Sequence, residues 1–169
     1  MVASPHLDEK TFPVHVVTGE FLLKGELRVR GVLDTLLNGE DITTVSLFEV
    51  QAQALDPGNV AAQFAAPKVV LARRACQFIV FSERPSGDDV MIKANLRAAV
   101  LYTPRFAIRG SVHLGGERTV TDVLGDIKGY FLPVADAELF PLFRIRANLP
   151  RQSPLVLVYR DHAEIIQER

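Results

Sequence analysis

The chain has 169 residues, of which 48% are hydrophobic and 23% charged, and it contains no tryptophan. Its formal net charge is −1 and its isoelectric point is near 6.4, whereas nucleic-acid binders usually carry a basic patch that neutralises phosphates. We therefore expect a folded protein with a core of Val, Leu, Ile and Phe, and no nucleic-acid partner.

The chain has a single cysteine, Cys76, so no intrachain disulfide can form and a reducing compartment is expected. A lone Cys in an apolar run is interpreted as a small buried hydrophobe. The first ten residues lack a signal-peptide pattern, and no apolar run approaches the roughly 18 residues of a membrane helix. These features predict a cytoplasmic protein with no membrane insertion.

In chain order, residues 21–30 alternate apolar and polar side chains, which predicts a strand with one buried face. Apolar residues at helical spacing in 32–37 predict one or two helical turns, with Asn38 and Gly39 as a left-handed cap or, alternatively, a type I′ hairpin turn. Further strands are predicted over residues 45–55 and 68–81, separated by the loop Asp56–Pro67.

The same order recurs after the short turn at residues 84–89. Strands are predicted over 90–102 and 106–114, and a helix starts near Val120 with Thr119 or Thr121 as its N-cap. Two more strands follow, over residues 130–142 and 154–166.

Residues 14–83 and 99–169 look like two copies of one module. The identities at a shift of 85 positions are Thr18 with Thr103, Phe21 with Phe106, Gly25 with Gly110, Gly31 with Gly116, Asp41 with Asp126, Ile42 with Ile127, Leu47 with Leu132, and Ala52 with Ala137. At a shift of 86, Val70, Leu71, Arg74, Ile79 and Val80 pair with Val156, Leu157, Arg160, Ile165 and Ile166. A repeat of this kind predicts a duplicated unit; the alternative is shared composition of two β-meanders.

The predicted fold is mainly β, with two tandem pseudo-symmetric modules, each a small bent β-barrel or β-meander with one short helix, packed together. Residues 1–84 form the first module, with an N-terminal arm at 1–13, and residues 90–169 form the second; they can pack as a single pseudo-twofold domain. The element order resembles that of SH3-like and Sm-like barrels, which implies no activity. Gly25 and Gly110 predict a bulge in a bent strand or, alternatively, close approach of a ligand.

No catalytic, cofactor-binding or metal-ligating residue is predicted, and no ligand-binding residue is assigned. His6, His15, His113 and His162 lack the spacing of metal ligands, and nucleophile-elbow, phosphate-loop and paired-cysteine motifs are absent. The carboxylates considered are Asp41, Asp126, Asp136 and Glu138. For Asp41 and Asp126, turn capping is the favoured interpretation because both copies carry the residue.

Arg73 and Arg74 do not reproduce the arginine motif of PilZ-type cyclic-dinucleotide sensors. They are adjacent rather than three residues apart, and the segment from Asp41 to Ser46 lacks the closing glycine, so the match fails. We predict one inward and one outward arginine at a strand edge, with an anion contact as the alternative.

The leading hypothesis is a non-enzymatic cytoplasmic interaction, adaptor or assembly protein without cofactor or metal, which binds a protein partner or itself through exposed strand edges. One alternative is a small-molecule or nucleotide sensor with its site in the cleft between the copies. Another is an enzyme that uses carboxylates other than the four named above, or Tyr102, Tyr130 and Tyr159. The functional surface is expected where the copies differ or meet, for example in the loop Asp56–Pro67.

Overall fold

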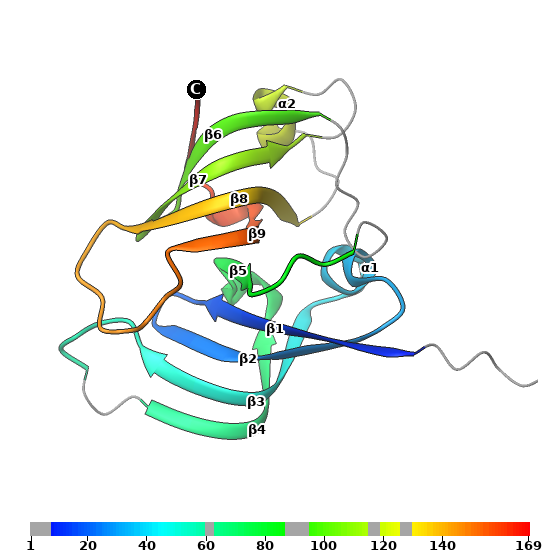
Figure 1. Cartoon of the computed structure of the whole chain (residues 1–169), viewed down its shortest axis with the longest axis vertical. Helices are drawn as coiled ribbons and strands as arrows, with labels where there is room; N and C mark the ends of the chain where they lie inside the picture. The colour runs from blue at the N-terminus through cyan, green and yellow to red at the C-terminus, as the bar shows by residue number, and fades with distance from the viewer. Residues whose placement is uncertain (1–7, 60–62, 87–94, 115–118, 126–129) are drawn as a thin grey trace, which may run out of the picture.

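Ten strands join into one antiparallel sheet in the computed structural model, which describes residues 8–59, 63–86, 95–114, 119–125 and 130–169 (Figure 1). The first half contains β1 (Glu9–Val17), β2 (Phe21–Arg30), α1 (Leu33–Asn38), β3 (Thr44–Ala54), β4 (Gln63–Ala72), the 3-10 turn η1 (Arg73–Ala75) and β5 (Phe78–Phe81). The second contains β6 (Leu96–Tyr102), β7 (Phe106–His113), α2 (Val120–Gly125), β8 (Phe131–Pro141), β9 (Gln152–Tyr159), the 3-10 turn η2 (Arg160–His162) and β10 (Ile165–Glu168).

The mainly β prediction is confirmed, and so are the two short helices. The hydroxyl of Thr119 accepts a hydrogen bond from the Asp122 N–H at 3.2 Å, so Thr119 is the N-cap that the sequence suggested. Gly39 is not a left-handed cap, since its φ is −58°. A side chain there would instead meet the Thr35 carbonyl at 2.8 Å, so close packing explains this glycine.

Two predicted strands are wrong in their extent. Residues 68–81 and 154–166 are each split into two strands by a 3-10 turn, because the chain changes direction at Arg73 and at Arg160. β1 begins at Glu9, inside the predicted N-terminal arm. Residues 90–94 of the predicted strand 90–102 lie outside the described residues.

The barrel prediction is also wrong, because the sheet does not close. The strand order is β10-β6-β7-β8-β9-β5-β1-β2-β3-β4. A closed first barrel needs β4 to pair with β5, but β5 pairs with β1 on one side and with β9 of the other half on the other. The two halves therefore share one continuous sheet, joined in its middle at β5 and β9.

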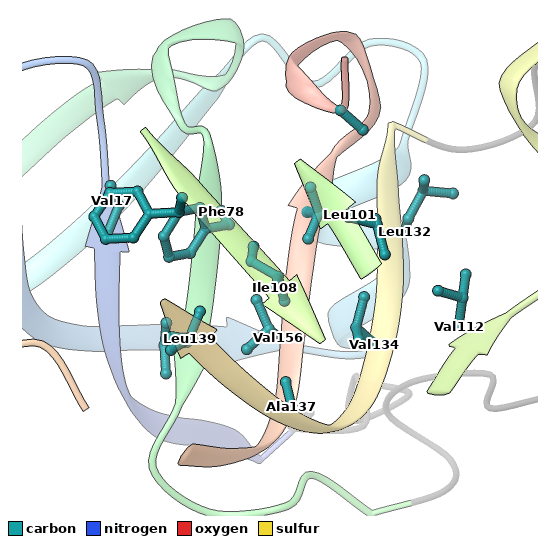
Figure 2. Close-up of a cluster of buried hydrophobic side chains, with 14 of the residues drawn as sticks. Val17, Phe78, Leu101, Ile108, Val112, Leu132, Val134, Ala137, Leu139 and Val156 are labelled. Atoms are coloured by element: carbon teal, nitrogen blue, oxygen red, sulfur yellow. The ribbon is translucent and has the colours of Figure 1, made fainter. Parts of the chain in front are cut away.

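Two cores lie against this sheet, and each takes side chains from both halves. The second-half core includes Val17, Leu22, Leu55, Phe78 and Val80 of the first half; Figure 2 shows Val17 and Phe78 gathered with second-half residues such as Ile108 and Leu139. The first-half core includes Phe131, Leu155, Leu157 and Tyr159 of the second half. Because neighbouring residues of a strand point to opposite faces, the two cores lie on opposite faces of β5 and β9.

The two halves have the same neighbours in the sheet. Each runs in the order fifth, first, second, third, fourth strand, as β5-β1-β2-β3-β4 and β10-β6-β7-β8-β9. The hydroxyl of Thr18 accepts the Phe21 N–H at 3.0 Å and that of Thr103 accepts the Phe106 N–H at 3.2 Å, so the same turn joins the first two strands of each half.

The sheet register corrects several of the sequence pairings. Equivalent positions are 85 apart in the first two strands but 87 apart afterwards, as η1 at Arg73 and η2 at Arg160 show. Leu47 therefore matches Val134 rather than Leu132, because they pair with Val69 and Val156 respectively. Every pair that the sequence suggested at a shift of 86 is likewise wrong by one residue, because the equivalent positions there are 87 apart. Gly116, Asp126 and Ile127 lie outside the described residues.

A bulge interrupts the second strand of each half at its glycine. The register shifts between Lys24 and Glu26 and again between Arg109 and Ser111, opposite the positive-φ residues Glu49 and Asp136. A Cβ on Gly110 would lie 2.7 Å from both the Ala135 carbonyl and Val134 Cγ1. The glycine thus allows one backbone to cross closely over another, as the bulge interpretation predicted.

We expect Gly110→Ala to lower the free energy of unfolding by about 1–3 kcal/mol, because the new methyl group would overlap the backbone carbonyl of Ala135 as well as the side chain of Val134. Gly19→Ala is the matched control, since a Cβ there meets nothing within 4 Å. Urea denaturation of both variants measures the difference. Equal stability of the two variants would contradict the close-crossing explanation.

Candidate functional site

The sheet has two free edges, β4 and β10, at opposite ends of the molecule (Figure 1). Among the described residues, β4 is paired only with β3, and β10 only with β6, where Ile165 to Glu168 lie opposite Tyr102 to Ala99. Each edge therefore presents a row of backbone N–H and C=O groups on its outer side that can pair with an added strand.

Both edges expose large apolar side chains. Val70 on β4 and Ile165 on β10 are 57% and 58% exposed, and Phe64 at the start of β4 is 44% exposed. Leu71 follows Val70, and Ile166 follows Ile165. Both are half-buried, and they pack against the first-half and the second-half core respectively. Apolar residues thus occupy both the outward and the inward positions, which is unusual for edges that remain solvated.

Each edge also carries features that limit indiscriminate pairing. Pro67 on β4 has no N–H to donate, and Lys68 follows it. β10 is only four residues long and ends in Glu168. Short strands, proline and charge are the usual protection of edge strands, so these edges favour selected partners over general aggregation.

The β5–β9 junction shows what a paired edge looks like in this fold. Phe78, Ile79, Val80 and Phe81 lie opposite Val158, Leu157, Val156 and Leu155 in antiparallel register. All eight are buried, none more than 3% exposed. Two further hydrogen bonds extend the junction, from the Tyr159 N–H to the Gln77 carbonyl at 2.8 Å and from the Ser153 hydroxyl to the Phe81 carbonyl at 2.8 Å.

Arg73 connects the end of β4 to α1 and to the second half. It is 5% exposed and donates to the carbonyls of Leu37 at 3.1 Å and Gly39 at 2.8 Å. Its guanidinium lies 3.5 Å from the ring centroid of Tyr130, a cation–π contact. Asn38 completes the connection, since its side-chain oxygen accepts the N–H groups of Tyr130 and Phe131, each at 2.9 Å.

The inward and outward arrangement predicted for the two arginines is therefore correct, although they lie in a 3-10 turn. Arg74 is exposed, and its carbonyl is 2.7 Å from His162 Nε2. The Arg73 guanidinium is occupied by carbonyls and an aromatic ring, which gives it a structural role in place of an anion contact. No sequence pattern pointed to these partners, which come from residues 34 or more positions away.

The histidines are dispersed over the sheet. His15 lies on β1 opposite Lys24, His113 ends β7 and His162 ends η2, whereas His6 lies outside the described residues. Among the residues that the structure describes, no three His, Cys, Asp or Glu side chains are grouped in a way that could hold a metal ion.

Two of the carboxylates line a surface cavity of about 470 Å³. Asp136 and Glu138 of β8 border it, together with Gln152, Ser153 and Pro154 of β9. Glu138 forms an ion pair with Arg109 at 2.6 Å. Asp41 is exposed, and Asp126 lies outside the described residues. The cavity lies within the second half, not between the halves.

The three tyrosines have structural neighbours. The Tyr102 hydroxyl is 3.2 Å from Gln167 Oε1, which ties β6 to β10. Tyr130 and Tyr159 stack with ring centroids 6.2 Å apart. Cys76 is buried, as expected, and burial raises its pKa to about 12, so the thiol stays protonated.

Over the described ranges, neither helix is long and apolar enough to cross a membrane. Comparison of the chain with protein-family models, with curated proteins and with solved structures finds no match. The candidate site therefore rests on the geometry of the sheet: two free edges and one paired junction.

We expect Arg73→Met to lower the free energy of unfolding by about 1–3 kcal/mol, because it leaves the Leu37 and Gly39 carbonyls without their donor. Arg74→Met is the control, since its side chain is exposed and one residue away. Thermal denaturation compares the two. Equal melting temperatures of the two variants would show that the Arg73 contacts do not stabilise the fold.

A pH dependence is expected from His15. Burial, and secondarily the charge of Lys24, lower the pKa of His15 below its usual 6.5. Between the two pKa values the unfolded chain binds more protons, so stability is full above about pH 6.5 and declines as the pH falls below it. His15→Gln should remove this part of the decline, whereas the control His162→Gln should keep it; urea titrations at about pH 7.5 and 5.5 measure both. An unchanged decline in His15→Gln would exclude this origin.

Proposed function

We propose that this protein is a non-enzymatic cytoplasmic interaction or assembly module, whose protein partner adds a strand to a free edge of the sheet. The observation that carries the proposal is that β4 and β10 have no strand on their outer sides within the described part of the chain, while Val70 and Ile165 are more than half exposed there. Strand addition gives affinity through backbone hydrogen bonds and specificity through alternate side chains.

An internal duplication is part of this proposal. Its support is the common strand order of the halves, the repeated threonine turn and the glycine bulge at matching positions. Duplication accounts for the two edges, because the copies form one junction and leave one edge of each copy outside it.

The alternative of a nucleotide sensor is less well supported by the cavity that borders β8 and β9. Asp136 places a carboxylate at its wall, which repels phosphate, whereas the charge of Glu138 is balanced by Arg109. The contact between the halves is instead filled by apolar side chains of the two shared cores.

The test uses the full chain and two labelled peptides taken from its own junction. A peptide of residues 76–82, which carries the β5 sequence, should bind at β4, and one of residues 152–159, which carries the β9 sequence, should bind at β10. Val70→Lys should weaken the first and Ile165→Lys the second by about tenfold, since each loses the burial of one aliphatic side chain. Fluorescence anisotropy measures both affinities.

Leu142→Lys is the matched control, because Leu142 is 54% exposed but lies after β8 and away from either edge. It should leave both affinities unchanged. Absence of saturable binding by either peptide would contradict strand addition. An equal loss in the control variant would show that the effect is one of general surface charge.

A further inference from the structure

β4 and β10 are the counterparts of the two strands that already pair in the middle of the sheet. β4 and β9 each carry a proline, Pro67 and Pro154, five residues before the end of the strand, and each leads into a 3-10 turn. β5 and β10 each follow that turn after two residues. β4 thus corresponds to β9, and β10 to β5. The two free edges are the equivalents of the two strands that pair at the junction, but they lie at opposite ends of the molecule.

We propose that the partner at these edges is a second copy of the chain, with β4 of one copy paired to β10 of the next. This inference rests on the function proposed above and specifies its partner. The register of this contact follows from the β5–β9 pair, when each residue is replaced by its equivalent 87 positions away in the other half. Ile165, Ile166, Gln167 and Glu168 of one copy would lie opposite Leu71, Val70, Val69 and Lys68 of the other.

The side chains at these positions are complementary. Glu168 would face Lys68, so opposite charges meet where the internal junction has Phe81 and Leu155. Ile166 would face Val70, where the internal junction has Ile79 and Leu157. A shift of the pairing by one residue would break both matches, because it would move the side chains of one strand to the opposite face of the sheet.

Pairing also accounts for the exposed apolar residues at the edges. Val70 is 57% exposed, but its counterpart Leu157 is 3% exposed; Ile165 is 58% exposed, but its counterpart Phe78 is fully buried. Each counterpart is covered by the opposing half, since Leu157 lies in the core with first-half residues and Phe78 in the core with second-half residues. A second copy supplies that strand with the same geometry.

One chain cannot make this contact with itself in the observed fold, because its two edges lie at opposite ends of the sheet (Figure 1). The contact is therefore head to tail, and repetition leads to a closed ring or an open filament. It should be weaker than the internal junction, since Lys68, Ala72 and Glu168 replace Leu155, Tyr159 and Phe81. Assembly is thus expected to be reversible and dependent on concentration.

Sedimentation velocity up to about 1 mM chain measures the assembly. We expect species with masses that are multiples of 18.7 kDa, growing with concentration. Lys68→Glu or Glu168→Lys alone should weaken association by about threefold or more, because like charges then face each other. The double variant, with both changes in one chain, should regain the original association.

Disulfide cross-linking tests the register. A chain with Val70→Cys, mixed with a differently tagged chain with Ile166→Cys, should give a covalent heterodimer, because opposed strand residues lie within disulfide reach. Val70→Cys mixed with Glu168→Cys is the off-register control, and Leu142→Cys is the control for exposure. The native Cys76 is buried and stays outside the reaction.

The outcomes separate this inference from the proposed function. A chain of constant 18.7 kDa mass at every concentration overturns the second-copy partner; if the β5 and β9 peptides still bind, strand addition itself stands. Assembly without the Val70–Ile166 cross-link, or without rescue in the charge-swapped double variant, also overturns the inference. Failure of both the peptides and the assembly overturns the proposed function as well.

Discussion

The pairing of β5 with β9 is the contact on which the rest of this structure depends. It is the only place in the strand order where the two halves are neighbours in the described sheet. Both strands are buried on both faces, and alternate residues enter different cores. Breaking this pair removes side chains from both cores at once, so neither half has a complete interior without the other.

The alternation of side chains made most individual strands predictable. In β2 and β7 the apolar residues recur at every second position, and the structure places strands there with a bulge at Gly25 and Gly110. The sheet order was not predictable in the same way. Strand pairing is a non-local contact, and the wholly apolar β5 reads as a continuation of β4 because a 3-10 turn at Arg73 has no distinctive sequence pattern.

The sequence led us to expect exposed strand edges, but it did not indicate which strands would form them. Exposed edges follow from any open sheet, yet only the strand order identifies β4 and β10 as the edge strands of the described sheet. The relation between these edges and the junction is not visible at an offset of 85 or 86 residues, because Pro67 matches Pro154 only at the offset of 87. The contacts of Arg73 with Leu37, Gly39 and Tyr130 were likewise hidden, since they join segments distant in the chain.

The shared cores have a consequence for how the chain acquires its structure during synthesis. The first-half core needs Phe131, Leu155, Leu157 and Tyr159 from the second half. An emerging first half therefore exposes one side of β5 on the ribosome until β9 has been translated. We expect the two halves to fold cooperatively once β9 has been translated, in contrast to the usual order in which an N-terminal unit folds before its successor appears.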